Sequence, residues 1–304
     1  MAVGDTITAS RYNIIQARVA SVLGLGAGDE GYGQAVSSSQ VTTGTTITAV
    51  HMNDLLSDMT KCRVHQTNAI PTSALAVSAG DSIDDDNSTS KKGYAQYESL
   101  STTCQTARLS VGAGQTGVES GIASSRTTNW STTITHEVTV SFTGYSVTNG
   151  DGSTTTISNV DHMRVFFNAG GTINFSGTIG TGSTTINNDW RNLMTSVGTV
   201  SFGRTATSNG SVGTSLGYDD MSASYQTIFT KNASAYGAND YTVKAKIASN
   251  VLTFLVEFND DKGPNPNYDE AITATTTSTV QMSRPNNSAS VDINTPAFAT
   301  TSAL

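Results

Sequence analysis

The chain has 304 residues, of which 36% are hydrophobic and 13% are charged, and its formal net charge at pH 7 is −8. Proteins that bind a phosphate backbone need clustered lysine and arginine, but Lys91-Lys92 is the one adjacent basic pair, so no nucleic-acid partner is expected. No apolar run approaches the roughly 18 residues of a membrane span, so no membrane partner is expected either. The first residues lack the basic and apolar regions of a signal peptide, so we expect synthesis in a cytoplasm without export by that route.

A short phrase occurs twice near the start of the chain. Gly4–Val19, GDTITASRYNIIQARV, aligns without a gap with Gly44–Met59, GTTITAVHMNDLLSDM, and the two copies share the glycine, the Thr-Ile-Thr-Ala run and an asparagine. Each copy reads as a strand-like Thr-Ile-Thr followed by an amphipathic helix. The sequence therefore predicts a small helical module over residues 1–68, built from a 40-residue duplication.

The two predicted helices have recognisable ends. The first is capped by Thr8 or Ser10 and ends near Leu23, where a Gly-rich stretch follows. The second runs over about Ala49–Val64 and is capped by Thr48. Two helices of about four turns form only a thin core, so their apolar stripes must be covered by each other, by the rest of the chain or by another subunit.

The apolar stripes are the candidate docking or oligomer surface of this module. Helical spacing places on them Ile14, Ile15, Val19, Val22, Met52, Leu55, Leu56 and Met59. Packing of the two helices on each other or on the remaining chain is the alternative, and the sequence does not separate the two.

Residues 69–95 have no period and contain Pro71, Gly80 and an acidic run, which predicts a linker. Residues 96–304 read as one antiparallel β domain, because apolar and polar residues alternate in several stretches. The predicted strands include TITHEVTVSFTGY, SYQTIFTK and ITATTTSTVQMS, a hairpin in DYTVKAKIASNVLTFLVEFNDD, and a hairpin in HMRVFFNAGGTINFSGTI with its first strand through Phe167 and its turn at Gly170-Gly171. One helix, NNDWRNLMTSVG, interrupts them and stops at Gly198. The predicted fold class is mainly β, with a sandwich-like domain after the helical module.

No motif assembles a catalytic, cofactor or metal site. GTSLG around Ser215 matches a nucleophile elbow, but no apolar strand precedes it and no helix follows. The four histidines lack zinc spacing, and His51 and His65 read as packing or capping residues. Cys62 and Cys104 form no CxxC pair, so both are expected as reduced or buried thiols. We therefore expect no enzyme and no cofactor.

Two acidic loops leave alternatives open. The run Asp84-Asp85-Asp86 fails the EF-hand pattern, since position six is Thr89, but a looser calcium site stays open beside a solvated loop. Glu257–Glu270 concentrates carboxylates that a glycosidase could use as a pair, although a solvent-facing loop explains them as well. The members of that pair would come from Asp260, Asp261, Asp269 and Glu270. Five tyrosines are candidates for sugar stacking or for subunit contacts: Tyr145, Tyr218, Tyr225, Tyr236 and Tyr241.

The phrases themselves carry a resemblance. The opening ITASRYNIIQARVASVLGLGAGDEGYGQ and VTTGTTITAVHMNDLLSDMTKCRVHQ resemble the N-terminal region of tail-fibre-like virion structural proteins from tailed phages of marine bacteria, of the cyanophage type. The later DHMRVFFNAGGTINFSG, SYQTIFTK, YGANDYTVKAKI and VEFNDD are similar to the β-rich remainder of that group. The resemblance implies a non-enzymatic particle component and carries over no functional residues.

On this basis we expect a phage virion structural protein, a fibre or appendage of the tail, neck or baseplate that docks by its N-terminal module and exposes its β domain. The expected partners are other virion proteins and further copies of the chain, with a trimer expected by analogy with fibres. The expected location is the virion, after assembly in the cytoplasm of an infected bacterium. A host-glycan-binding adhesin and a capsid decoration protein are the alternatives.

Overall fold

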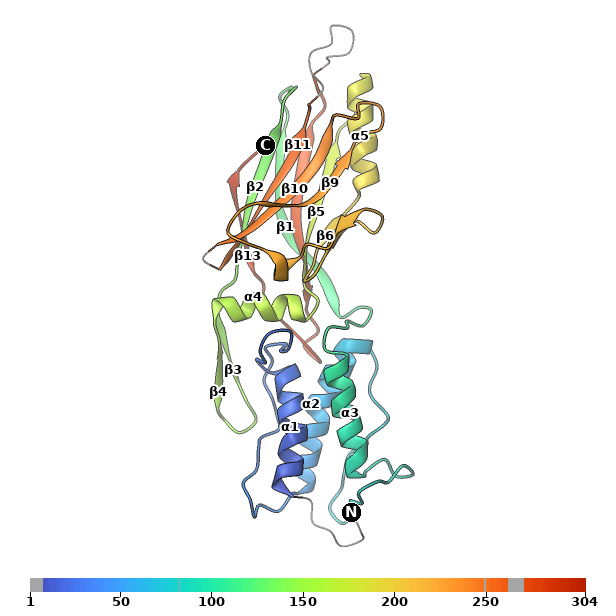
Figure 1. Ribbon diagram of the computed structural model, residues 1–304, viewed down its shortest axis with the longest axis vertical. Coiled ribbons are helices and arrows are strands. Elements are labelled where there is room, and N and C mark those ends of the chain that lie inside the picture. The colour runs from blue at the N-terminus through green and yellow to red at the C-terminus, as the bar shows by residue number, and fades with distance from the viewer. Residues whose placement is uncertain (1–7, 82, 249, 262–270) are drawn as a thin grey trace. The chain divides into compact units, whose positions relative to one another are not determined.

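The computed structural model describes residues 8–81, 83–248, 250–261 and 271–304, and Figure 1 shows its helices and strands. The helices of this part are α1 (Ala9–Leu23), α2 (Ala49–Thr67), α3 (Tyr94–Thr106), α4 (Asn159–Asn168) and α5 (Thr185–Val197), with one 3-10 turn at Tyr218–Asp220. Helices account for 26% of the chain and strands, all in antiparallel sheets, for 30%. The fold is therefore mixed, with more helix than the mainly β prediction allowed.

The chain divides into two compact units, and each is built from three separate segments. Residues 1–117, 143–170 and 284–294 form the first, which we call the helical unit, and residues 118–142, 171–283 and 295–304 form the second, the sheet unit. This division differs from the predicted boundaries. The predicted linker 69–95 lies inside the helical unit, and two segments of the predicted β domain 96–304 return to that unit.

Helices α1, α2 and α3 lie side by side and run parallel (Figure 1). Their first turns meet, because the Tyr12 hydroxyl donates to the carbonyl of His51 at 3.1 Å and Arg11 of α1 pairs with Glu98 of α3. Their later turns meet as well, since Gln66 of α2 donates to the Cys104 carbonyl of α3 at 2.8 Å. The predicted starts of α1 and α2 are confirmed: the Thr8 and Thr48 hydroxyls accept from the backbone of the third helical residue.

Helix α3 is absent from the sequence prediction. It buries Tyr94, Tyr97, Leu100, Ser101 and Cys104, which repeat every three or four residues as one helix face requires. Serine, cysteine and tyrosine make this face weakly apolar, and the helix begins directly after a polar, acidic stretch. Helix α3 packs against α1 and α2 and so completes a core that two helices alone would leave thin.

Helix α4 corrects a second prediction. The segment expected as a strand through Phe167 is helical, and Ser158 caps its start by accepting from the Asp161 backbone. Phe166 and Phe167 are both buried on this helix. It follows a two-stranded hairpin of β3 (Tyr145–Thr148) and β4 (Thr154–Ile157), which was also not predicted.

The sheet unit contains two larger antiparallel sheets. One has the order β1 (Thr116–Arg126), β12 (Thr276–Pro285), β5 (Thr172–Ile179), β6 (Val200–Phe202), β7 (Thr207–Ser208) and β8 (Gly213–Thr214). The other has the order β13 (Ala297–Ser302), β2 (Ile134–Ser141), β11 (Val251–Asn259), β10 (Asp240–Ala248) and β9 (Gln226–Asn232). The predicted strands at β2, β9 and β12 and the predicted β10–β11 hairpin are confirmed. Strands β1 and β13 were not predicted.

The core of the sheet unit lies where the two sheets meet. Phe254 of β11 packs against Phe175 of β5 at 4.9 Å and against Phe202 of β6 at 5.2 Å, both between ring centroids. Helix α5, confirmed with its stop at Gly198, adds Trp190, whose ring lies 5.1 Å from that of Trp130. Strand β2 contributes Ile134, His136, Val138 and Val140, which are buried and alternate with half-buried residues.

Candidate functional site

The predicted docking stripe is largely enclosed by its own chain. Six of its eight residues have no exposed surface: Ile15, Val19, Val22, Met52, Leu55 and Met59. Leu56 is half-buried, whereas Ile14 is 57% exposed. The helical stripes are therefore present at these six positions, and their enclosure favours the alternative that the two helices pack within the chain.

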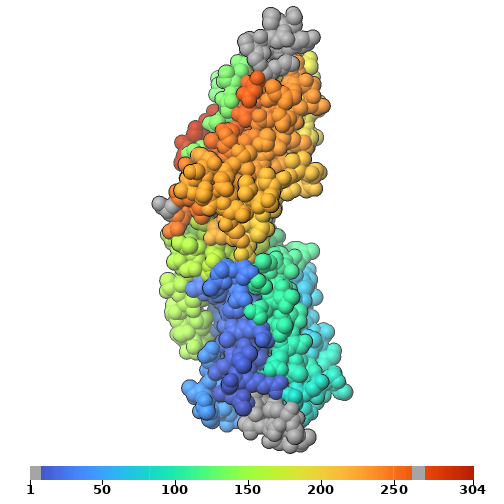
Figure 2. All heavy atoms as spheres, viewed as in Figure 1, coloured from blue at the N-terminus to red at the C-terminus, as the bar shows by residue number. Residues whose placement is uncertain are grey.

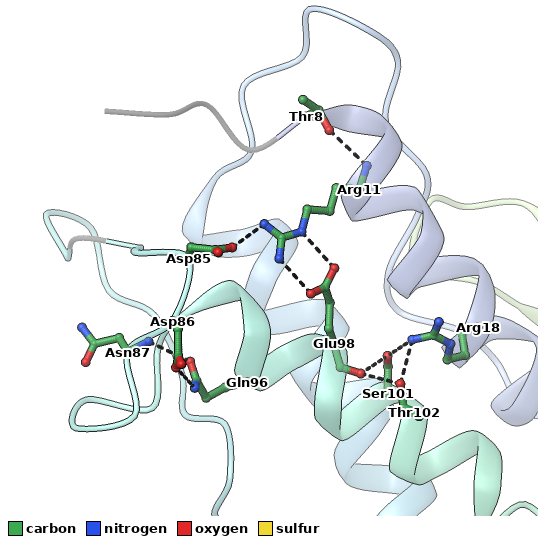
Figure 3. A network of polar contacts seen from close by, with 10 residues as sticks. All are labelled: Thr8, Arg11, Arg18, Asp85, Asp86, Asn87, Gln96, Glu98, Ser101 and Thr102. Atoms are coloured by element: carbon green, nitrogen blue, oxygen red, sulfur yellow. Dashed lines mark hydrogen bonds and ion pairs between the residues drawn. The ribbon is translucent and has the colours of Figure 1, made fainter. Parts of the chain in front are cut away.

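A polar network joins the first turn of α1 to α3 and to the acidic loop before it (Figure 3). The Arg11 guanidinium binds Glu98 through two nitrogens at 2.9 and 2.8 Å and Asp85 through a third. It also lies 4.4 Å above the Tyr94 ring. Hydrogen bonds from Arg11 hold the pKa of Glu98 below its usual value. Further along, Arg18 donates to the Ser101 hydroxyl at 2.9 Å (Figure 3).

The asparagine shared by the two copies of the phrase makes the same contact in each. The Asn13 side chain donates to the carbonyl of Val41 and accepts from its backbone N–H, both at 2.9 Å. Asn53 does the same with Val77, again at 2.9 Å in both directions. Each asparagine thereby clamps the extended segment that follows its own helix. The sequence marked these residues as identical, but it gave no sign of their role.

Replacing Asn53 by alanine should lower the free energy of unfolding of the helical unit by about 2 kcal/mol, since two hydrogen bonds to backbone groups of Val77 are lost. Urea denaturation followed by circular dichroism at 222 nm measures this. Asn13→Ala should cost a similar amount. Asp54→Ala, on the next residue of the same helix, should cost far less, and an equal loss there would contradict the clamp.

A groove of about 400 Å³ lies in the helical unit between α1, the segment after it and the β3–β4 hairpin. Figure 2 shows the yellow-green atoms of this hairpin beside the blue atoms of those segments. The polar side chains along it are Gln16, Ser38, Ser39, Gln40, Asn149, Asp151 and Thr155. Asn149 accepts from the Val36 backbone and donates to Thr155, so it fixes the hairpin to the opposite wall. Amides, hydroxyls and a carboxylate together suit a neutral, hydroxylated ligand.

The acidic run 84–86 does not gather around one point. Asp85 faces Arg11 and Asp86 accepts from Gln96 (Figure 3). Asp84 accepts from the Asn87 side chain. Each carboxylate thus faces a different donor. Among the described residues no cluster of three or more His, Cys, Asp or Glu side chains could hold a metal ion.

The second acidic loop lies partly outside the described residues, and Asp269 and Glu270 belong to that part. Asp260 is buried and Asp261 is exposed at its start, while Glu257 pairs with Lys244 across β10 and β11 at 2.8 Å. The Ser215 motif also lacks its expected surroundings. Ser215 is exposed after the short β8, and no α-helix follows it. These residues form no nucleophile elbow.

The five candidate tyrosines give no open stacking surface. Tyr236 and Tyr241 are buried, and Tyr145 and Tyr218 are half-buried. Tyr225 donates to Glu137 at 2.6 Å and lies beneath the Lys246 ammonium, 4.2 Å from its ring centroid. Within the described ranges every aromatic side chain is at least half-buried.

His65 is enclosed in the helical unit, as the packing prediction expected. It has no exposed surface, and its Nε2 lies 3.1 Å from the Ala169 carbonyl, so Nε2 carries the hydrogen. Its ring meets the Tyr32 ring edge-on, at 4.8 Å between centroids. Burial lowers the pKa of His65 to about 4, and it also lowers the pKa values of His136 and His162.

The burial of His65 predicts that the protein loses stability at pH values well above those at which ordinary carboxylates become protonated. An unfolded histidine titrates near pH 6.5, so between about 6.5 and 4 the unfolded chain binds a proton that folded His65 does not. The contribution of neutral His65 to the free energy of unfolding is complete above the pKa of the unfolded histidine. Titration of this residue alone should lower the free energy of unfolding by about 2 kcal/mol between pH 7 and pH 5. Urea midpoints against pH measure this. His65→Gln should flatten the slope, whereas His51→Gln should not, and an unchanged slope in both would contradict the assignment.

Comparisons with known proteins add no relative: no protein-family model, no curated protein and no solved structure matches the chain. Among the described helices none is long and apolar enough to cross a membrane. The contacts described above join α1, α2, α3 and the segments between them into one unit, and a polar groove lies in this unit.

Proposed function

We propose that the chain is a non-enzymatic structural protein of a phage virion, a fibre or appendage of the tail, neck or baseplate. The observation that carries the proposal is the matched pair of helix starts. Thr8 and Thr48 cap α1 and α2, and Asn13 and Asn53 clamp the segments that follow. These contacts come from the phrase that resembles virion proteins, and they serve to hold a scaffold together instead of assembling reactive groups.

Two finer features of the fold belong to this proposal. The helical unit arose by duplication of a 40-residue segment, an idea supported by the identical asparagine clamps. The sheet unit is a sandwich, an idea supported by the stacking of Phe254 on Phe175 and by the hydrogen bond between His136 of β2 and Ser278 of β12. Polar outer faces on such a unit suit a surface-exposed domain.

The helical unit would attach the chain to other virion proteins or to further copies of itself, with a trimer as the proposed assembly and the virion as the location. Because six of the eight stripe residues are enclosed, the attachment surface must consist of side chains that remain outside. Ile14, on the outer side of α1, and Val50, in the first turn of α2, are 57% and 66% exposed.

Light scattering on the purified chain tests this surface. Deletion of residues 1–68 is unsuitable, because it would strip α1 and α2 from α3 and expose Tyr94 and Tyr97. We instead expect an oligomer that Ile14→Asp dissociates, while Val212→Asp, at an exposed apolar site in the sheet unit, leaves it intact. An oligomer unaffected by Ile14→Asp would place attachment elsewhere.

The virion assignment itself is tested on particles. Antibodies against the chain should label purified particles of the phage that encodes it, and mass spectrometry should find the chain at a fixed ratio to the other particle proteins. A chain found in infected cells but absent from purified particles would contradict the proposal.

Glycan binding is the second candidate, and the groove of about 400 Å³ favours it. Its amides and hydroxyls would hydrogen-bond a sugar, although no exposed aromatic ring among the described residues would stack on it. A glycan array identifies such a ligand. Gln40→Ala should then abolish binding, whereas Gln226→Ala in the sheet unit should not.

A further inference from the structure

Two thiols face each other inside the helical bundle. Cys62 lies on α2 and Cys104 on α3, and neither has any exposed surface. The Cys104 sulfur lies 3.7 Å from the carbonyl of Met59, one turn before Cys62 on the same helix. A hydrogen-bonding contact with Cys104 is the largest of the causes that raise the pKa of Cys62, ahead of burial. The two sulfurs are therefore neighbours across the α2–α3 interface.

Neighbouring positions on two packed helices favour the close approach that a disulfide requires. Helix axes in contact are about 8–10 Å apart, and side chains that point at each other bring their Cα atoms towards the roughly 4.4–6.8 Å that a disulfide spans. Gln66, one turn after Cys62, holds the same α3 residue by donating to the Cys104 carbonyl at 2.8 Å. Cys104 thus contacts α2 both one turn before and one turn after Cys62.

We propose that Cys62 and Cys104 are an oxidative cross-linking site that joins α2 to α3 by an intramolecular disulfide. Both thiols are free in this structure. In the reaction each S–H bond breaks and one S–S bond forms, so the protein loses two electrons and two protons. When diamide is the oxidant, its N=N double bond accepts the two electrons and the two protons and becomes a hydrazine N–N single bond. With molecular oxygen, the product is hydrogen peroxide.

Burial decides when this reaction occurs. A thiolate is the attacking species, and the raised pKa of Cys62 keeps that thiol protonated. Neither sulfur has exposed surface, so both are shielded from an oxidant. Oxidation must then wait for a transient opening of the bundle, and the bond, once closed inside, is shielded from reductants in the same way. The pair would therefore act as a latch that closes slowly and stays closed.

The full-length protein treated with diamide tests this. The chain is then unfolded, alkylated with N-ethylmaleimide and weighed intact. We expect a mass about two daltons below that of the reduced chain, no alkylation, and, after trypsin, the peptides Cys62–Arg63 and Gly93–Arg108 recovered as one species that a reductant separates. Two alkylated thiols after oxidation, or dimers linked through them, would overturn the proposal.

Two further readouts separate a latch from incidental oxidation. Oxidation should be several-fold faster in urea just below the unfolding transition than in plain buffer, because opening limits it. The melting temperature of the helical unit should rise by about 5–10 °C on oxidation, since a long loop is closed. Cys104→Ser given the same treatment should show no rise. An oxidised chain with the same melting temperature as the reduced chain would mean that the disulfide distorts the bundle. That result would overturn the proposal that the bond joins α2 to α3 in their present packing.

Discussion

Replacing Asp58 by alanine should lower the free energy of unfolding of the helical unit by about 3–5 kcal/mol. The Asp58 carboxylate has no exposed surface, and its two oxygens accept from the backbone N–H groups of Ser37 and Ser38 at 2.9 and 2.8 Å. The Lys61 ammonium lies 4.0 Å away. Alanine would leave both N–H groups without an acceptor and the ammonium without its counter-charge.

Asp58→Asn refines the test, because the amide keeps the shape of the side chain and one oxygen acceptor. Its NH2 group would then face one of the two backbone N–H groups of Ser37 and Ser38, donor against donor. We expect a loss between those of alanine and wild type. Circular dichroism at 222 nm reports the helices, whereas tryptophan emission reports only the sheet unit, which contains both tryptophans of the chain. We expect the unfolding midpoint measured at 222 nm to fall while the midpoint measured by tryptophan emission stays unchanged. An unchanged midpoint at 222 nm would mean that Asp58 does not stabilise the helical unit.

Trp190→Ala should destabilise the sheet unit by about 3–5 kcal/mol, because it leaves a large cavity. Trp190 has no exposed surface and packs against the rings of Trp130 and Phe258, at 5.1 and 6.0 Å between centroids. Its indole nitrogen is buried without a hydrogen-bond partner among the described residues. No hydrogen bond is therefore lost on substitution, and the whole cost comes from packing.

Trp190→Phe separates packing from polarity. Phenylalanine removes the unpaired N–H and keeps most of the ring volume, so we expect a loss under about 1.5 kcal/mol. The emission of the remaining Trp130 follows guanidinium unfolding in both variants. A phenylalanine variant as unstable as the alanine variant would show that the indole nitrogen has a partner that stabilises it.

Alternation of buried and less buried residues is clearest in two of the predicted strands, β2 and β12. Strand β2 alternates buried and half-buried residues along its whole length, and β11 pairs with β10 in the register that their alternation implies. Such a pattern fixes both the element and the face that it buries. Strands β1 and β13 escaped prediction because both are mostly exposed and so have no buried face to reveal.

Helix α4 was misassigned for the opposite reason. Its run from Val165 to Phe167 is continuous and apolar, and such a short run fits a buried strand as well as a buried helix. The cap at Ser158 was the local signal that favours a helix. Helix α3 carried a regular spacing, but on tyrosine and cysteine, whose burial only tertiary packing decides.

The docking stripe shows the limit of reading a surface from periodicity. Its spacing identified the buried positions of α1 and α2 except for the exposed Ile14 and the half-buried Leu56. Which elements cover those positions depends on tertiary packing. The Asn13 and Asn53 clamps illustrate the same limit, since each binds a residue more than twenty positions away whose distance in space no local pattern encodes.

The interleaved segments of the two units have a consequence for synthesis on the ribosome. Arg284 reaches the Asp292 carboxylate and the Ile293 carbonyl, and Gln34 donates to the carbonyl of Asp292, so residues near the end of the chain complete the helical unit. That unit cannot finish folding until these residues have left the exit tunnel, long after α1 emerged. Translation must therefore reach residue 294 before the helices near residue 10 become permanent, and contacts so distant in sequence are slow to form.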